Sequence, residues 1–228
     1  MTSIVQFIAM LALLPAGDMN AIQAGFFHIL DDGRSADTAR GEIYIVFPAL
    51  THIHITQPVN QIMRVSTDET IIYYPDTKEA FVYKNPSPIS TSWLSNLGKG
   101  AIENTFEGIG LKLLNKYTIA EKEISFWEKP KKKKEPLVRI KVIKENGLLS
   151  KLVFFSEDGE TLAVNNYGDY KQIADTFYLP THIENVTNTT TGKSREIIIL
   201  SSPEALSRAP AEIIDFKIPP DAHISTYE

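Results

Sequence analysis

The sequence predicts a mainly β protein, a curved antiparallel sheet of about ten or eleven strands with short helices packed on it. Residues 41–83 hold five short runs rich in Ile, Val, Tyr and Phe, and residues 117–218 hold a second series of such runs. Helical spacing of apolar residues is confined to residues 4–14 and 90–116. Because no internal repeat or linker interrupts this pattern, we expect a single domain over residues 1–228.

The meander of residues 41–83 is the clearest part of this pattern. Its runs are separated by Pro, Asn, Asp and Thr, which are typical of tight connections between antiparallel strands. Pro48, Pro58 and Pro75 stand at the ends of runs, where a missing backbone N–H removes no hydrogen bond from a sheet. The strands are expected at residues 41–48, 51–58, 61–66, 70–75 and 80–83.

Strands are also expected before and after the meander. Residues 22–30 form a run that ends at Asp31-Asp32-Gly33, and Asn146-Gly147 joins two later runs. Asp-Gly and Asn-Gly are both typical of hairpin turns. A single helical turn is expected at residues 203–206. The later strands are expected at residues 118–127, 137–144, 148–155, 161–173, 178–187, 194–200 and 213–218.

Two segments have helix character. Residues 4–14 contain one polar residue and end before Pro15 and Gly17. They have the length of a signal-peptide core but follow no Lys or Arg, and they also fit a helix of the mature domain. Residues 1–21 are therefore either a signal peptide or an N-terminal helix. Residues 90–116 are apolar but interrupted by glycines, which predicts short helices or a mobile loop forming a lid on the sheet.

Alternation along the strands assigns their faces, because successive side chains of a strand point to opposite sides. In the meander, the outward-facing set includes Glu42, His52, His54 and Arg64. Residues 71–74 are apolar on both sides and show no phase. An apolar concave face of this kind needs either a packed core or an apolar ligand. The inward-facing set is Ile43, Ile45, Phe47, Ile53, Ile55, Met63 and Val65.

Composition excludes several classes of function. The net charge of −5 gives no indication of a nucleic-acid partner. The chain has no Cys, which excludes disulfide frameworks, zinc–thiolate sites, cysteine nucleophiles and attachment of a lipid to an N-terminal Cys. No apolar stretch reaches the length of about 18 residues that a membrane-spanning helix needs.

Motifs for catalysis are not found. The sequence has no glycine-rich phosphate loop, nucleophile elbow or H-E-x-x-H motif, and its carboxylates are scattered over turns. We therefore predict that the chain is not an enzyme and uses no cofactor. His52 and His54 share one strand face at a spacing suited to metal ligands, but no third ligand lies nearby in the sequence. A solvated strand face without a metal is the favoured interpretation.

Lys129-Pro-Lys-Lys-Lys-Lys-Glu-Pro136 is the one concentration of charge. It fits a docking site for anionic lipid headgroups or for an acidic partner. It also fits a solvated hairpin tip that protects a sheet edge from aggregation, which is the interpretation we favour.

Several motifs, in chain order, carry a family resemblance. These motifs are residues 22–28 (Ile-Gln-Ala-Gly-Phe-Phe-His), Asp32-Gly33, residues 41–48, 53–58 and 65–75 and, near the end of the chain, residues 215–220 (Asp-Phe-Lys-Ile-Pro-Pro). This set resembles the LolA family, periplasmic carriers of outer-membrane lipoproteins. Asn166-Tyr-Gly-Asp-Tyr170 with Tyr178-Leu-Pro-Thr-His-Ile183 is similar to the broader group of LolA-like lipoprotein-sorting proteins.

The resemblance implies both a fold and a function. The fold is a single curved, incomplete antiparallel β-barrel whose concave apolar face is covered by short helices. The function is that of a monomeric periplasmic carrier, which holds acyl chains of lipid or lipoproteins and passes them from an inner-membrane donor to an outer-membrane acceptor. In the family, an Arg before the Pro holds the lid shut by hydrogen bonds. Here that position is Phe47, whose ring has no donor.

Two hypotheses follow for the function. In the first, the chain is a carrier with an apolar cavity. In the second, it is a non-transporting interaction or sensor module of the bacterial envelope, with the same fold and a filled core. A cavity of roughly several hundred Å³ separates the two, because ligand sites have volumes of this order. The carrier's predicted cavity lining is Ile43, Ile45, Phe47, Ile53, Ile55, Met63 and Val65, with Trp93, Leu94 and Phe106 from the lid.

Overall fold

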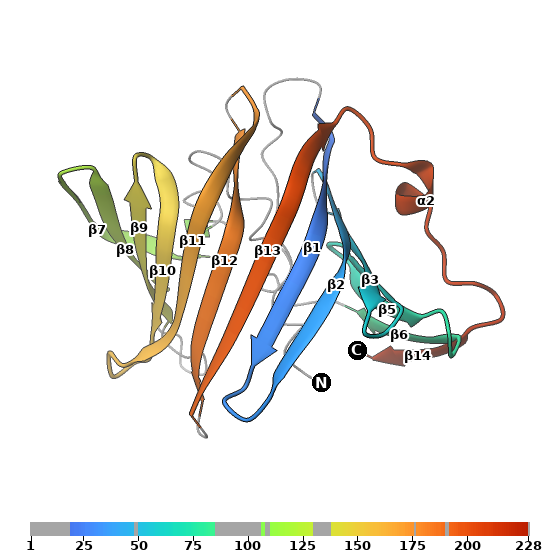
Figure 1. Ribbon diagram of the computed structural model, residues 1–228. Coiled ribbons are helices and arrows are strands. Elements are labelled where there is room, and N and C mark those ends of the chain that lie inside the picture. Colours follow the sequence, from blue (N-terminus) through green and yellow to red (C-terminus); the bar gives the residue numbers. More distant parts are fainter. Residues whose placement is uncertain are drawn as a thin grey trace.

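The computed structural model describes residues 19–47, 50–84, 106–107, 110–129, 138–175, 177–189 and 192–227. In this part of the chain, the strands form one 14-stranded sheet (Figure 1). The first half contains β1 (Ala21–Asp31), β2 (Ala36–Val46), β3 (Leu50–Gln57), β4 (Gln61–Val65), β5 (Glu69–Tyr74), β6 (Glu79–Lys84) and β7 (Lys112–Ile119). The second half contains β8 (Lys122–Lys129), β9 (Val138–Glu145), β10 (Leu148–Phe155), β11 (Thr161–Ala174), β12 (Phe177–Thr189), β13 (Gly192–Leu206) and β14 (His223–Tyr227).

The sheet is curved and open, and its centre is the pair β1 and β13. From β1 the meander β2 to β6 extends to one side, and from β13 the strands run back through β12 to β7 on the other. All neighbouring strands are antiparallel, except that β14 runs parallel to β6. Because β14 and β7 lie at opposite ends of the order, the sheet does not close. The predicted curved, incomplete antiparallel sheet is confirmed.

The sheet has 14 strands, more than the sequence predicted. The sequence predicted one strand over residues 118–127, but the chain turns within this range, between β7 and β8. The turn contains Ala120 at φ 53°. No Gly, Asn or Pro marks that turn, so the sequence gives no signal for it. By contrast, Asn146 and Gly147 have φ values of 53° and 79° and join β9 to β10, which confirms the predicted hairpin.

The expected helices over the concave face are not supported. In the described ranges, the one helix with defined bounds is α2 (Ala211–Ile214), and it lies outside the sheet (Figure 1). Residues 112–116 of the expected lid belong to β7, and residues 203–206 end β13, because both segments pair with a neighbouring strand. Residues 1–18, most of the expected lid with Trp93 and Leu94, and residues 130–137 lie outside the described residues.

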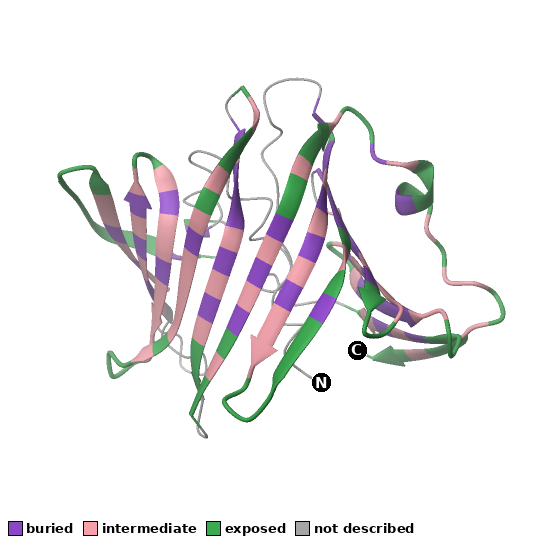
Figure 2. Cartoon of the chain, in the orientation of Figure 1, coloured by how far each residue is buried: buried purple, intermediate pink, exposed green. Residues whose placement is uncertain are grey.

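The concave face carries the main hydrophobic core. Alternate residues of the strands are buried along the sheet (Figure 2). Ile140 and Val142 of β9 are buried and alternate with the partly exposed Arg139 and Lys141. The core contains every inward-facing residue predicted from the meander, together with residues of β1, β12 and β13 such as Ile22, Phe26, Leu179, Ile183, Ile198 and Leu200.

The C-terminal segment, residues 209–222, covers the opposite, convex face over β2 to β6. Ala209 and Ile213 pack with Tyr44 and Val46, and further along Phe216 and Ile218 pack against a second cluster. That second cluster consists of Ile71, Tyr73, Ala80 and Val82. Both faces of β5 are therefore covered, which explains why residues 71–74 show no alternation of apolar and polar side chains. The alternation within residues 213–218, which predicted a strand, reflects packing onto the sheet rather than strand pairing.

His52 is buried under this segment, so its expected solvated position is wrong. The residue is 4% exposed, and its ring meets the rings of Tyr44 and Phe216 edge-on at centroid distances of 6.4 and 5.5 Å. Burial, followed by the charge of Arg64 and then by His54, lowers the pKa of His52 to about 4. His54 is only half-buried, and its Nε2 lies 3.0 Å from the side-chain oxygen of Asn60.

Arg64 attaches the covering segment to the sheet. Its guanidinium donates to the backbone carbonyl oxygens of Ile213 and Ile214, the latter at 2.9 Å. Ile213 and Ile214 form the C-terminal end of α2, where carbonyl groups lack partners within the helix and a cation is favourable.

The Arg64→Met substitution is expected to loosen this attachment. Met keeps much of the apolar stem but cannot donate, so the free energy of unfolding should fall by about 1–2 kcal/mol. Urea unfolding measures this loss, and limited proteolysis should show faster cleavage within residues 207–222. Arg195→Met is the matched control, because Arg195 forms an exposed pair with Glu184 at 2.5 Å and should cost less than about 0.5 kcal/mol. Equal effects of the two substitutions would contradict the attachment.

Candidate ligand-binding site

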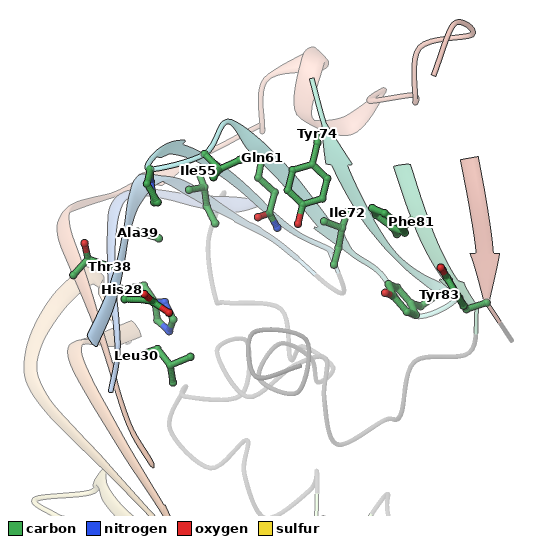
Figure 3. A pocket seen from close by; sticks show the side chains of 14 residues that line it. His28, Leu30, Thr38, Ala39, Ile55, Gln61, Ile72, Tyr74, Phe81 and Tyr83 are labelled. Atoms are coloured by element: carbon green, nitrogen blue, oxygen red, sulfur yellow. The ribbon is translucent and has the colours of Figure 1, made fainter. Parts of the chain in front are cut away.

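A cavity of about 400 Å³ opens in the concave face between β1–β2 and β5–β6–β14. The side chains of His28, Leu30, Ile72 and Tyr83 point into the hollow of the sheet, whereas Thr38 lies on its outer side (Figure 3). Asp37 and Thr38 at its margin are exposed, so the cavity meets solvent at the beginning of β2. Its lining consists of His28, Leu30, Asp37, Thr38, Ala39, Ile55, Pro58, Val59, Gln61, Ile72, Tyr74, Phe81, Tyr83 and Tyr227.

One wall of the cavity is aromatic. The rings of Tyr74 and Phe81 meet edge-on at 6.1 Å, and Tyr227 of β14 stacks on Tyr83 at 5.0 Å and on Phe81 at 6.4 Å. Burial raises the pKa of Tyr74, with smaller contributions from Tyr83 and Glu79, so its hydroxyl stays neutral near pH 7. A neutral, mostly apolar wall of this kind suits an uncharged hydrocarbon better than an anion.

A buried polar network borders the opposite wall. His28 Nε2 lies 2.7 Å from Glu196 Oε1, and Asn185 donates from Nδ2 to Glu196 Oε2 at 3.2 Å. The ring of Phe26 is stacked on His28 at 6.0 Å. His28 is the member of the network that lines the cavity.

The predicted cavity residues that the structure describes are brought together on the concave face, but most of them lie in the packed core beside the cavity. Ile55 lines the cavity, whereas Ile43, Ile45, Ile53, Met63 and Val65 belong to the concave-face core. Phe47 is buried there against Phe177, with ring centroids 5.9 Å apart. Phe106 is buried against Trp127 of β8 at 5.5 Å. Contact of any of these residues with a ligand stays a prediction.

Sequence reasoning missed the cavity residues of β1, β6 and β14. The signal for His28 was present, because Ile22, Ala24, Phe26 and His28 alternate on one face, so a histidine interrupts an apolar series. Phe81 and Tyr83 also share a face in the sequence. Nothing local could have placed Tyr227 beside them, because β14 pairs with a strand from the first half of the chain.

Other kinds of site have less support in the described residues. No group of three or more His, Asp or Glu side chains in these ranges is arranged to hold a metal ion. A search of the same ranges for a helix long and apolar enough to cross a membrane finds none.

The open, curved sheet with its concave cavity places the chain in a fold known from solved structures. A LolA superfamily protein from Nitrosomonas europaea matches with a TM-score of 0.58 and 14% identity, covering 92% of this chain and 95% of that one. A proposed outer membrane lipoprotein-sorting protein domain from Vibrio parahaemolyticus matches with a TM-score of 0.57 and 16% identity, covering 86% and 89%. A DUF1329 family protein from Desulfovibrio piger matches with a TM-score of 0.60 and 12% identity, covering 85% and 89%.

These likenesses confirm the LolA-like fold that the sequence motifs suggested. At such low identities they speak for the fold alone. No protein-family model and no curated protein sequence matches the chain.

Proposed function

We propose that this protein is a non-enzymatic carrier that binds the acyl chains of lipids or lipoproteins in its concave cavity. The observation that carries the proposal is the cavity of about 400 Å³ with an aromatic and aliphatic wall, set in a LolA-like sheet. This volume lies within the range of about 300–1,000 Å³ that is usual for small-molecule sites. It favours a carrier over the interaction or sensor module with a filled core.

Binding in this cavity would rest on the hydrophobic effect. Each methylene group that leaves water for an apolar wall contributes about 0.8 kcal/mol, so the roughly 8 kcal/mol of micromolar affinity corresponds to about ten methylene groups, the size of an acyl chain. No covalent step is needed. Release would need a membrane or a partner that stabilises the emptied protein, because an equilibrium shifts only through differential affinity.

The cellular setting is part of the same proposal. The likeness to a LolA superfamily protein and to a lipoprotein-sorting domain supports a periplasmic protein that takes its cargo from an inner-membrane donor and delivers it toward the outer membrane. Phe47 is buried against Phe177, and its ring cannot donate to a lid carbonyl. Gating by a hydrogen bond at this position is therefore not part of the proposed mechanism.

Ala39→Phe is expected to block the cavity. Ala39 lines the cavity from β2 and is 8% exposed, so a phenyl ring there would occupy the space of the ligand. Binding of N-phenylnaphthylamine, an uncharged dye that brightens in apolar surroundings, should weaken about tenfold or more. Ala36→Phe adds the same ring at an exposed position of β2 and should leave binding unchanged.

Three outcomes decide the proposal. Dye binding by the wild-type protein that is lost only in Ala39→Phe supports it, as does lipid that is found by native mass spectrometry in the wild type and is missing from the variant. A wild-type protein that takes up no dye and carries no lipid contradicts the carrier. Dye binding that survives Ala39→Phe places the ligand elsewhere. Circular dichroism and a melting curve confirm that both variants are folded.

A further inference from the structure

The opening of the cavity carries acidic rather than basic charge. No Lys or Arg is among the described residues that line it, and Asp37 is their acidic member. Asp37 lies in β2 two positions before the buried Ala39, so both side chains are on the same face of the strand. His28 is the lining residue that can carry a positive charge, and the carboxylate of Glu196 lies 2.7 Å from its ring and offsets that charge.

The carboxylate of Asp37 is accessible to a ligand. The residue is exposed, and no hydrogen bond or ion pair joins its side chain to another of the residues that the structure describes. The two carboxylates that precede it in the hairpin differ in this respect. Asp31 accepts a hydrogen bond from the backbone N–H of Gly33, and Asp32 accepts one from that of Ser35, so both hold the turn between β1 and β2. The described fold makes no such use of Asp37.

The aromatic wall of the same cavity also favours a positive group. The faces of aromatic rings carry negative potential, and four rings line this wall, those of Tyr74, Phe81, Tyr83 and Tyr227. Glu79 lies directly opposite Tyr74 in the pairing of β5 with β6, so its carboxylate is on the same face. Burial, then the neighbouring Tyr83 and Glu79, raise the pKa of Tyr74. A cation is therefore more favourable than an anion at the wall as well as at the opening.

We propose that the cavity selects amphiphiles whose polar end is an alkylammonium group over those with an anionic end, with the carboxylate of Asp37 as the counter-ion. This selection rests on the carrier function proposed above, since the acyl chain would occupy the apolar part of the cavity. The ammonium group gains from the opposite charge of Asp37 and from contact with ring faces, whereas a sulfate or carboxylate meets Asp37 as a like charge. Two sources offer this chemistry, the ammonium head group of a lipid and a small free ammonium compound.

Displacement of N-phenylnaphthylamine by matched competitors tests the selection. Decyltrimethylammonium, decyl sulfate and uncharged decanol share one chain and are used below the concentrations at which they form micelles. The wild-type protein should prefer the ammonium to the sulfate by about tenfold. Asp37→Asn should lower this preference about threefold to fivefold and leave the affinity for decanol unchanged. Asp158→Asn removes the same charge from an exposed turn between β10 and β11, away from the cavity lining, and should keep the wild-type preference.

Salt and the ring of Tyr227 provide tests that do not depend on Asp37→Asn. Raising sodium chloride from about 50 mM to about 500 mM should reduce the wild-type preference, because salt screens an exposed carboxylate. Tyr227 is 46% exposed and stacks on Tyr83. Tyr227→Leu removes a ring and should lower the preference about twofold, whereas Tyr227→Phe keeps the ring and the preference. Circular dichroism confirms that the variants are folded.

The outcomes separate the selection from the carrier function. Equal affinity for the ammonium and the sulfate, or a preference that Asp37→Asn and salt leave unchanged, overturns the selection and leaves the carrier standing. Failure of the dye and of every competitor to bind overturns both. Where the ammonium is preferred, choline and lauroyl lysophosphatidylethanolamine distinguish the two sources. Displacement by choline alone assigns the site to a free ammonium compound, and displacement that requires the acyl chain assigns it to a lipid.

Discussion

Gly41→Ala is expected to destabilise the protein by about 3 kcal/mol or more. Gly41 lies in β2 where the pairing with β3 shifts, so that Arg40 is opposite Gln57 and Gly41 is opposite Ile55. A Cβ at Gly41 would lie 1.9 Å from the backbone oxygen of His54 and 2.8 Å from Cα of Ile55. Neither atom belongs to a flexible side chain, so relief would require β2 and β3 to separate beside the cavity.

Urea unfolding of Gly41→Ala measures the effect, and Gly168→Ala is its control. Gly168 lies in β11, and a Cβ there would meet nothing within 4 Å. The control should change the free energy of unfolding by less than about 0.5 kcal/mol. If Gly41→Ala were as stable as the control, the close approach of β2 and β3 would be absent in solution.

The sequence could predict what depends on neighbours along the chain. Alternation placed the meander residues on one buried face, and Asn146-Gly147 marked a hairpin, because both features arise from local geometry. The need for glycine at position 41 could not be predicted. It depends on a shift in register against β3, which involves residues 55–57 of another strand.

The convex face shows a second limit of local patterns. His52 alternates with buried Ile53 and so was predicted to be solvated, but a segment some 150 residues later in the chain covers it. Arg64 shows this separation, because it is 149 positions from Ile213, whose carbonyl it binds. Periodicity reports which side of a strand a residue faces. It does not report whether that side is covered.

The predicted lining residues of the meander lie on the concave face, and their contact with a ligand stays a prediction. The cavity is shifted from them toward β5, β6 and β14. Its aromatic wall depends on Tyr227 stacking on Tyr83, and hence on the parallel pairing of β14 with β6. The residues predicted from the strongest strand patterns pack against one another, because long apolar side chains at the centre of a sheet fill the space between them.

The burial of His52 predicts a stability that depends on pH. The folded protein holds the pKa of His52 at about 4, below its ordinary value of 6.5, chiefly because burial disfavours the charged ring. Between these values the unfolded chain binds a proton that the folded protein does not. The stabilisation is therefore complete above pH 6.5 and is lost as the pH falls through about 4. With allowance for solvent screening of Arg64, the loss should be about 2 kcal/mol.

His52→Phe isolates this contribution from the acid titration of carboxylates. Phenylalanine keeps an aromatic ring against Tyr44 and Phe216 but cannot take up a proton. Urea unfolding of the variant between pH 7.5 and pH 4 should lose less stability than the wild type, by about 2 kcal/mol. Tyr44→Phe is the control, because it changes another ring that contacts His52. Burial raises the pKa of Tyr44 above its ordinary value of 10, so this substitution removes no group that titrates between pH 7.5 and pH 4 and should keep the wild-type slope. If His52→Phe and the wild type lost stability in parallel, the C-terminal segment would not cover His52 in solution, and the convex face would be open.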